Sequence, residues 1–439
     1  MESKRFAAVT GVAFLIYFAF FGGHYVSGDN AQRIAWAKAL IDCHCNDISA
    51  YMPGMQFTKY GIGASLIHVP FIVVARLFAR MTGLSIEGPL NMLLYTFNSA
   101  LGVALIYLLI RRQGVEWRHA AGGAVVIGVA SVWFPYSKLE YSEALVATMI
   151  LAMYLLADDH PWLTGLIGGL AIASRQDALI LVALTAAIAP ASRRSWVPIA
   201  LGTLPGSILT MVTNFQRSGS MLNSGYEVDF GTPILTGLYG FLLSAGKSLF
   251  LFSPLMVLYV AAARRQWHER ARRRLVLWSA ALLVIQLLFY SKWWDWSGDD
   301  AWGPRFLVTG TIFCLIVVAA SDYLGSGRFI ALAILGVLIE LPAVLMGPHN
   351  SLMLLHSRQP MTTDLSTSVR RPITLDDIRF DPKYSQVIDT IELLLFKVSN
   401  GRLEGSSSFL SSFDPPLRPD DIEIDVLWLH PNLHRRAGN

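Results

Sequence analysis

GIGASLIHVPFIVVARLFAR, residues 61–80, is the stretch that decides the topology of this chain. It is apolar and long enough to cross a lipid bilayer as a helix, which takes roughly 17 to 25 residues. Whether it crosses sets the side of the membrane on which every later loop lies. The rest of the sequence decides between the two alternatives.

The composition of the chain is that of a polytopic membrane protein. Of the 439 residues, 54% are hydrophobic and 15% are charged, and the mean hydropathy is +0.47. Soluble domains carry about 25% charged residues. A formal net charge of +4 gives no reason to expect nucleic acid as a partner. No small-residue cleavage site follows the amino-terminal apolar run, so we interpret it as a retained first span and not as a signal peptide.

Eleven further apolar runs are long enough to span or nearly span a bilayer. They lie near residues 6–25, 89–110, 119–135, 142–157, 162–174, 177–190, 197–213, 248–263, 275–290, 305–321 and 328–346. The sequence therefore predicts an all-α membrane protein, built as a bundle of about eleven transmembrane helices.

The basic residues favour one of the two topologies, because cytoplasmic loops carry an excess of Lys and Arg. If the amino terminus is cytoplasmic and 61–80 does not cross, the later basic loops all fall inside. Their arginines are Arg111, Arg112, Arg118, Arg193, Arg194, Arg264, Arg265, Arg270, Arg272, Arg273, Arg274 and Arg328. If 61–80 crossed, all of them would lie outside. We therefore predict that 61–80 is a juxtamembrane or re-entrant helix and that the carboxyl terminus is periplasmic.

The chain changes character after residue 346. Residues 347–439 are polar, rich in Ser, Pro and Asp, and contain no further span. We predict that 1–346 is a transmembrane domain and 347–439 a small periplasmic domain or ordered arm. Within the latter, DIEIDVLWLH at 421–430 alternates polar and apolar residues, which predicts a β-strand.

The polar residues of the membrane part gather in the loops of the outer face. The middles of the spans carry almost no charge. A transporter is expected to bury ionisable groups near the membrane midplane, often on broken helices in repeated halves. The sequence contains neither such groups nor an internal repeat, which favours chemistry at the outer face over transport.

Asp29 stands where the first span meets the outer surface. It is followed by NAQRIAWAKALI, in which apolar and basic residues alternate as they do in an interfacial helix. One interpretation is that Asp29 caps this helix by accepting backbone N–H bonds. The other is that its carboxylate acts as a general base for an acceptor hydroxyl. The two roles do not exclude one another.

Five segments share this face in a fixed order: Asp29 after the first span, TKYGIG at 58–63, SKLEYSEA at 137–144, GLAIASRQDALI at 169–180 and GPRFL at 303–307. Together they resemble membrane glycosyltransferases of the GT-C class, which include polyprenyl-phosphate-mannose transferases and the lipid A aminoarabinose transferase. The resemblance covers residues 1–346 and implies a GT-C-like bundle with periplasmic juxtamembrane helices.

The resemblance implies that Asp29 is the catalytic base of an inverting transfer from a polyprenyl-phosphate sugar to a lipid, glycan or protein acceptor. This chain departs from its relatives at two points. Many relatives carry Asp-Glu where this chain has Asp29 and Asn30. Their Lys-Pro is replaced by Lys59-Tyr60, which leaves Lys59 as a candidate contact of the donor phosphate.

A leaving phosphate requires fixed cations, and three basic residues of the outer face are candidates. Arg305 follows Gly-Pro and could hold phosphate oxygens with its planar fork, or could pair with Asp299 or Asp300. Arg175 could bind the donor, pair with Asp177 or anchor to lipid headgroups. Lys247 could bind the donor or simply extend to the interface from a span end.

WWDWSGDDAWGPRF, residues 293–306, supplies aromatic faces and carboxylates, the two groups that bind sugars. An interfacial aromatic belt would explain the tryptophans but not the neighbouring aspartates. We therefore predict sugar or acceptor contacts for Trp294, Asp295, Trp296, Asp299 and Asp300.

The remaining candidates for sugar or acceptor binding are Glu140, Glu143, Asn214 and Tyr226. Glu140 and Glu143 could equally pair with Lys138, and the loop that carries Asn214 and Tyr226 needs no ligand. A divalent metal ion held by Asp29 with Glu140 or Glu143 is an open alternative, so that no cofactor is assigned.

The stretch Cys43-His44-Cys45 resembles a metal site, but two cysteines separated by one residue rarely complete a tetrahedral zinc site alone. In a periplasm these thiols are expected to be oxidised or protected. Cys314 lies within a span and should be inert.

The sequence thus predicts a glycosyltransferase of a bacterial inner membrane with its active site at the periplasmic face. Two other functions stay open: a lipid or glycan transporter or flippase, and a ligase that moves a whole lipid-linked glycan. The partners expected are a polyprenyl-phosphate sugar, a lipid or glycan acceptor and the membrane itself.

Overall fold

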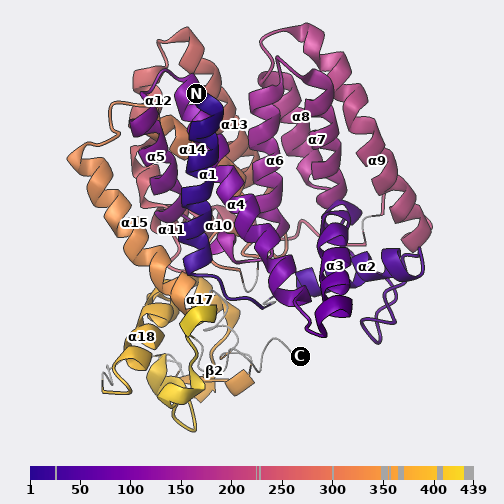
Figure 1. Ribbon diagram of the computed structural model, residues 1–439. Coiled ribbons are helices and arrows are strands. Elements are labelled where there is room, and N and C mark those ends of the chain that lie inside the picture. Colours follow the sequence, from indigo (N-terminus) through magenta and orange to yellow (C-terminus); the bar gives the residue numbers. More distant parts are fainter. Residues whose placement is uncertain are drawn as a thin grey trace.

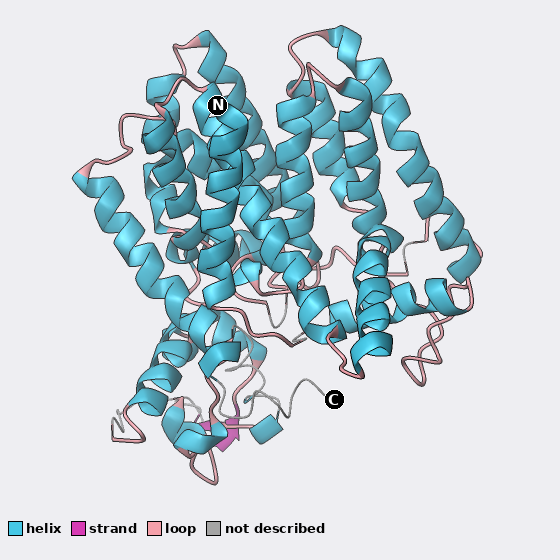
Figure 2. Ribbon diagram, viewed as in Figure 1, coloured by secondary structure: helices cyan, strands magenta, loops and turns pink. Residues whose placement is uncertain are grey.

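The computed structural model describes residues 1–24, 27–223, 225–226, 229–298, 301–347, 354, 357–363, 370–402 and 409–429. In these ranges the regular secondary structure is almost entirely helical (Figure 2). The described strands are β1 (Met361–Thr363) and β2 (Arg370–Pro372), which pair antiparallel with Thr362 opposite Arg371. The prediction of an all-α membrane fold is therefore confirmed in its coarse form.

The helices follow the predicted apolar runs closely. They are α1 (Glu2–Ala19), α2 (Gly28–Asp42), α3 (Ile62–Thr82), α4 (Glu87–Arg112), α5 (Trp117–Val129), α6 (Ser142–Leu156), α7 (Pro161–Ser174), α8 (Ala178–Ile188), α9 (Trp196–Ser218), α10 (Ile234–Leu243), α11 (Leu249–Phe252), α12 (Tyr259–Gln266), α13 (Arg270–Ser291), α14 (Val308–Ala319), α15 (Gly327–Met346), α17 (Leu375–Phe380) and α18 (Gln386–Val398). Five described helices are long and apolar enough to cross a bilayer: Ile62–Thr82, Glu87–Arg112, Arg193–Ser218, Arg272–Ser291 and Gly327–Met346.

The run predicted at 248–263 is not one continuous helix. It consists of α11, a 3-10 turn over Pro254–Leu258, and α12. Proline has no backbone N–H and forces the preceding residue out of the helical region. Ser253 accordingly has φ −148° and ψ 72°, which breaks the run between α11 and the turn.

One end of the bundle collects the amino terminus and the basic loops (Figure 1). The Arg111 Nε lies 3.5 Å from Glu2 Oε1, so the end of α4 meets the start of α1. Arg272 donates to the carbonyl of Gln113 at 3.0 Å, and Arg274 donates to the carbonyl of Ala189 at 3.3 Å. The loops that are rich in arginine thus share one face, as the predicted topology requires.

The opposite end carries α2, α3 and the segment after α15 (Figure 1). Gly61 and Gly63 lie against the backbone of Ala173 and Ser174, where no Cβ would fit. The start of α3 therefore abuts the end of α7, and α3 lies below α7 in Figure 1. Because α2 and α3 sit at this end, they position Asp29 beside the loops that precede α6, α8 and α14.

Helices α7 and α9, neighbours in the right half of Figure 1, pack closely through four glycines. Gly165 lies against Gly202, and Gly169 lies against Gly206, so that a Cβ on any of them would meet the facing backbone. Small residues let membrane helices approach this closely, because dispersion contacts and not the hydrophobic effect hold such helices together.

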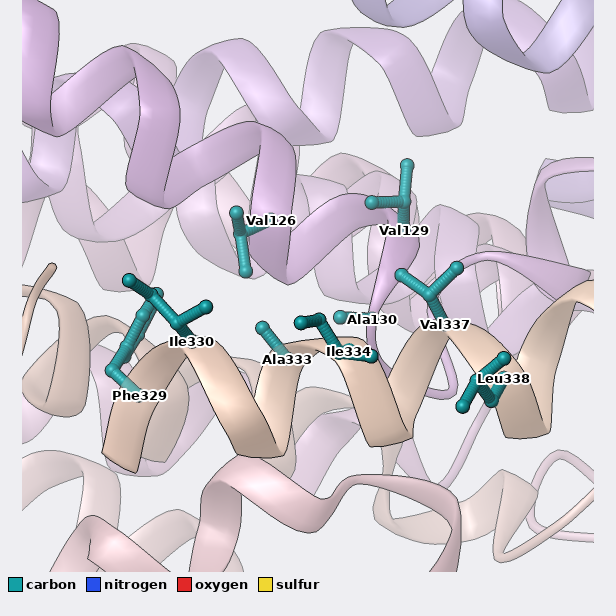
Figure 3. A pocket seen from close by; sticks show the side chains of 9 residues that line it. All are labelled: Val126, Val129, Ala130, Phe329, Ile330, Ala333, Ile334, Val337 and Leu338. Atoms are coloured by element: carbon teal, nitrogen blue, oxygen red, sulfur yellow. The ribbon is translucent and has the colours of Figure 1, made fainter. Parts of the chain in front are cut away.

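An apolar groove of about 370 Å³ runs between α5 and α15 (Figure 3). Val126, Val129 and Ala130 line it on one side. The residues on the α15 side are Phe329, Ile330, Ala333, Ile334, Val337 and Leu338. With no polar side chain in its lining, the groove offers dispersion contacts only and has no group that could do chemistry.

The described residues after α15 build a second apolar core. Leu393, Phe409 and Ile422 are fully buried in it, together with Met346 from the end of α15. Hydrogen bonds tie this core to the membrane part; among them, Gly246 donates to the carbonyl of Arg379 at 3.1 Å and Ser385 donates to the carbonyl of Ala245 at 2.7 Å.

The strand predicted for 421–430 is wrong in its described part. Residues Pro419–Asp421 and Leu427–Leu429 form 3-10 turns, and the residues between them pair with no strand. The polar and apolar alternation has another cause: Ile422 and Val426 are buried while the backbone binds single carbonyls of α15 and of the segment after α1.

Candidate functional site

Asp29 lies in the first turn of α2, but it does not cap the helix. The cap is Ser27, whose hydroxyl accepts the N–H of Asn30 at 3.1 Å. The capping role considered for Asp29 is therefore wrong, because Ser27 already provides the oxygen that the helix end needs. The Asp29 carboxylate is left to side-chain partners.

Three side chains surround the Asp29 carboxylate. The Tyr60 hydroxyl donates to Oδ1. On the other side, guanidinium nitrogens of Arg33 and Arg305 each lie 3.9 Å from Oδ2. Burial alone would raise the pKa of the Asp29 carboxyl, but the charges of Arg305 and Arg33 and the Tyr60 hydrogen bond outweigh it and hold that pKa below its usual value.

Arg33 joins α2 to the loop before α6. One nitrogen donates to the carbonyl of Glu140 at 2.8 Å, and another donates to the Ser142 hydroxyl at 3.3 Å. Its guanidinium also lies 4.7 Å from the centre of the Tyr60 ring. These contacts hold Arg33 almost completely buried, with 2% of its side chain exposed.

Glu143, in the first turn of α6, binds two arginines at once. Its Oε1 lies 2.6 Å from a terminal nitrogen of Arg175 and 3.2 Å from Nε of Arg305. The Arg305 guanidinium also lies over the rings of Tyr141 and Phe306, at 4.7 and 4.8 Å from their centres. Arg305 therefore bridges Glu143 and Asp29 between aromatic faces.

Arg175 and Asp177 form a two-bond pair at the turn between α7 and α8. The Arg175 Nε and a terminal nitrogen bind the two Asp177 oxygens at 2.9 and 2.7 Å. The Tyr290 hydroxyl also donates to Asp177. The pairing considered for Arg175 is thus present, and it coexists with the Glu143 contact. Burial favours loss of the Arg175 charge, but Asp177 and Glu143 hold its pKa well above the usual value.

These contacts make a row of alternating charges, which we call the ion row. In order, its members are Arg33, Asp29, Arg305, Glu143, Arg175 and Asp177. A small cavity of about 10 Å³ lies along it, walled partly by the stacked rings of Tyr290 and Phe306, whose centres are 4.4 Å apart. The ion row largely fills its own pocket.

Lys59, Tyr226 and Asn214 lie beside Tyr60, on the side of α2 and α9. The Lys59 ammonium lies 5.1 Å from the centre of the Tyr226 ring and 5.8 Å from that of Tyr60. Asn214 Oδ1 accepts from Gln176 at 2.9 Å and so links α9 to the turn that carries Arg175. Lys59 is exposed, which leaves its charge accessible from outside.

Glu140 and Lys247 are buried in backbone contacts. Glu140 accepts the N–H of Ser27 at 3.0 Å, which ties the loop before α6 to the start of α2. Lys247 donates to the carbonyl of Ala301 and is 1% exposed. Gln386 of α18 donates to the same carbonyl at 3.3 Å. Lys247 thus lies under the carboxy-terminal core and not in the ion row.

The aromatic cluster divides between the core and the surface. Trp296 is 3% exposed and packs edge-on against Phe241, with ring centres 5.4 Å apart. Trp294 is 50% exposed. Asp295 lies 3.8 Å from Arg379 of α17. Asp299 and Asp300 lie outside the described residues. The roles proposed for these five residues in sugar binding stay predictions.

Cys43 and Cys45 are joined to each other by a disulfide, so neither sulfur is a free thiolate for a metal ion. Cys314 is buried, as expected of a cysteine within a span. In the described ranges, no three His, Cys, Asp or Glu side chains gather closely enough to hold a metal ion.

Sequence reasoning missed Tyr60, Arg33 and Tyr290. Arg33 could have been found, because it stands four residues after Asp29 on a predicted helix and must share its face. Tyr60 replaces the proline of the relatives next to Lys59, which was the signal available for it. Nothing in the local sequence indicates Tyr290, since its contact to Asp177 joins residues 113 positions apart.

A solved structure shares the fold of this chain. The crystal structure of ArnT from Cupriavidus metallidurans in the apo state superposes with a TM-score of 0.52 at 12% identity, over 90% of this chain and 68% of ArnT. The crystal structure of the Archaeoglobus fulgidus oligosaccharyltransferase, tethered with an acceptor peptide, matches with a TM-score of 0.41 at 13% identity, over 91% of this chain and 57% of that chain. No protein-family model and no curated protein matches the sequence. At this identity the likeness to ArnT shows a shared fold and nothing finer, in agreement with the helical membrane fold that the sequence predicts.

Proposed function

Because the chain has the fold of a GT-C membrane protein, we propose that it is a membrane glycosyltransferase. It transfers a sugar, with inversion, from a polyprenyl-phosphate donor to a lipid, glycan or protein acceptor. The observation that supports this most directly is the ion row, which brings Asp29 and Arg305 together at the end of the bundle that carries α2 and α3. Such a row supplies a base and fixed cations within one site.

Arg305 and Arg175 are suited to the donor phosphate. Breaking the bond between the anomeric carbon and the phosphate oxygen leaves a phosphate dianion, which fixed cations stabilise as it forms. A guanidinium can hold two phosphate oxygens in parallel bonds, as that of Arg175 holds the two carboxylate oxygens of Asp177. The donor phosphate therefore takes the place of Glu143 or Asp29 on Arg305.

Asp29 is suited to act as the base for the acceptor hydroxyl. Tyr60 binds Oδ1 and fixes the plane of the carboxylate, while Oδ2 faces the arginines. Its lowered pKa keeps Asp29 ionised at neutral pH. When the donor phosphate draws Arg305 away from Oδ2, the carboxylate becomes a stronger base, because it loses a neighbouring positive charge.

The exposed side of the site would receive the substrates. Lys59 and Tyr226 lie next to Tyr60, and Lys59 can approach a phosphate as a point charge. Trp294 is the half-exposed ring of the aromatic cluster and the best candidate there for contact with a sugar face. Lys247 is the weakest of the proposed phosphate contacts, because it is buried against the Ala301 carbonyl.

The proposed enzyme is a multi-pass protein of a bacterial inner membrane. Eleven spans, with α3 at the surface, give a cytoplasmic amino terminus and a periplasmic site. The gathering of the arginine-rich loops at the end opposite Asp29 supports this orientation.

The test is sugar transfer from a panel of radiolabelled polyprenyl-phosphate monosaccharides to membrane extracts, comparing wild type with Asp29→Asn. The charge-matched control is Asp159→Asn at the opposite end, where 68% of the side chain is exposed. Transfer should be lost in Asp29→Asn and unchanged in Asp159→Asn. Equal transfer by Asp29→Asn would move the base to Glu143 or Glu140. No transfer from any donor by the wild type would favour a flippase or a ligase of larger glycans.

A further inference from the structure

We propose that Asp425, near the end of the chain, is a positioning residue that holds both segments flanking Asp29 in place. Its carboxylate Oδ2 lies 2.9 Å from the ammonium of Lys138, in the loop before α6. The Lys138 side chain is 3% exposed and that of Asp425 is 11% exposed. This ion pair joins residues 287 positions apart and connects the carboxy-terminal segment to the loop that carries Glu140 and Glu143.

The segment around Asp425 is seated by its backbone as well. The N–H of Asp425 donates to the carbonyl of Leu345 at 2.7 Å, and the N–H of Leu427 donates to the carbonyl of Phe21 at 2.8 Å. The indole of Trp428 donates to the carbonyl of Phe18 at 3.0 Å. The carboxy-terminal segment therefore contacts the end of α15 and the end of α1 together.

The slot around the Asp425 carboxylate is shaped to this one side chain. A Cβ on Gly22 would come within 2.7 Å of Oδ1, and one on Gly347 would come within 2.9 Å of Oδ2. Gly347 also has φ +77°, a backbone conformation that favours glycine. The third neighbour is His24, whose Nε2 lies 3.5 Å from Oδ1.

The held segments lead directly to the proposed base. Lys138 also donates to the carbonyl of Val344 at 2.9 Å, so its loop cannot shift without breaking contacts to α15. Two residues later, Glu140 accepts the N–H of Ser27, which caps α2 and so sets the position of Asp29. Gly22, on the other flank, precedes Ser27 by only five residues. Asp425 thus restrains the chain before Asp29 and the loop whose Glu140 binds Ser27.

The experiment compares wild type, Asp425→Asn and Asp420→Asn as full-length proteins in nanodiscs. Asparagine keeps the shape of the side chain but has no charge to pair with that of Lys138, and Asp420→Asn makes the same charge change at an exposed position of the same segment. Hydrogen exchange is followed in peptides covering 27–34 and 135–143. In Asp425→Asn both should exchange about tenfold faster, while peptides within α4 are unchanged. Asp420→Asn should match wild type.

The kinetic part of the proposal rests on the proposed transferase function. In the sugar-transfer reaction, kcat should fall by about tenfold or more in Asp425→Asn, because a small misplacement of a reacting group slows the chemical step. Unchanged exchange in both peptides, or unchanged kcat beside faster exchange, would overturn the positioning role. If the wild type shows no transfer, the exchange result still decides whether Asp425 holds the loop.

A second variant covers the case in which Asp425→Asn does not fold. Lys138→Met with Asp425→Asn removes both charges, and no charge is stranded in the slot. It should show the same faster exchange at 135–143 as the single variant. If the 135–143 peptide of the double variant exchanged as slowly as that of the wild type, the proposal would be contradicted.

Discussion

Asp29 is held by side chains from three separate parts of the chain. Arg33 comes from its own helix, Tyr60 from the segment before α3, and Arg305 from the segment before α14. Arg305, Arg33 and the Tyr60 hydroxyl all lower the pKa of the carboxyl, and the Tyr60 hydrogen bond also fixes its orientation. Variants at these positions should therefore be distinguishable by pH dependence as well as by rate.

Tyr60→Phe should move the acid limb of the pH profile. A base works in its ionised form, so activity is retained at neutral pH and lost as the pH falls through the lowered pKa of Asp29. Loss of the Tyr60 hydroxyl raises that pKa, so the acid limb shifts to higher pH and kcat at neutral pH falls about tenfold. The measurement is kcat/KM for transfer from about pH 2.5, below the unperturbed pKa of an aspartate, up to about pH 8. An unshifted limb would contradict the role of Tyr60.

The control for this variant is Tyr239→Phe. Tyr239 is 50% exposed and lies in α10, away from the ion row. The Tyr239→Phe substitution also removes one hydroxyl, but at a position away from Asp29. Its pH profile should coincide with that of the wild type.

Arg305→Lys should be severely impaired even though the charge is kept. Lysine lacks the planar fork with which Arg305 reaches Asp29 and Glu143 together. We expect kcat/KM to fall about 100-fold, as measured by transfer from the active donor. Arg328→Lys, at an exposed position, is the matched control and should behave as wild type. Near-normal activity of Arg305→Lys would show that charge alone suffices.

Among the elements, the contact of α7 with α9 is the most sensitive to side-chain size. Gly165 and Gly169 meet Gly202 and Gly206 backbone to backbone. This contact fixes α9 beside α7 and, through the bond of Gln176 to Asn214, the turn that carries Arg175. The fold of this half of the bundle thus depends on residues that have no side chain.

Gly206→Val should destabilise the protein by at least about 2 kcal/mol, because its side chain would force the two backbones apart. The control is Gly122→Val in α5, where a Cβ would meet nothing within 4 Å. The measurement is the midpoint of thermal unfolding in detergent. Equal midpoints for the two variants would mean that α7 and α9 can separate without cost.

At the scale of the whole molecule, the bundle has two chemically different ends. The amino terminus and the arginine-rich loops share one end, and Asp29, the ion row and the carboxy-terminal core share the other. The segments 27–33, 137–143, 174–177 and 303–306 converge although they are far apart in the chain. Only an orientation with the first end in the cytoplasm agrees with the distribution of basic residues.

Single cysteines placed at the two ends should report this orientation. An impermeant maleimide applied to intact cells should label Asp376→Cys, which is 74% exposed in the carboxy-terminal core. It should label Arg118→Cys, at an exposed position of the opposite end, only after permeabilisation. The readout is the mass shift of the labelled protein. The reverse pattern would mean that α3 crosses the membrane or that the amino terminus lies outside.

The sequence by itself determined most helices of the membrane part, their approximate bounds and the end of the bundle where the polar loops meet, but not α10 or the break within 248–263. Hydrophobic runs and an excess of Lys and Arg in certain loops are local features of the sequence, and these features direct how a chain inserts into a membrane. That is why the gathering of the arginine-rich loops at one end and of Asp29 at the other could be predicted from the amino-acid sequence alone. At 421–430 the alternation predicted a strand, but the backbone there binds single carbonyls of Leu345 and Phe21 and pairs with no strand in its described part.

Only the tertiary structure decided which side chains meet. It joined Glu143 to Arg175 and Arg305, gave Asp29 the hydroxyl of Tyr60, and buried Lys247 against a carbonyl instead of adding it to the ion row. The physical reason is that a contact between residues a hundred or more positions apart depends on how whole helices pack. Packing at the α7 and α9 glycines, or around Asp425, involves shapes and distances that no local pattern of residues encodes.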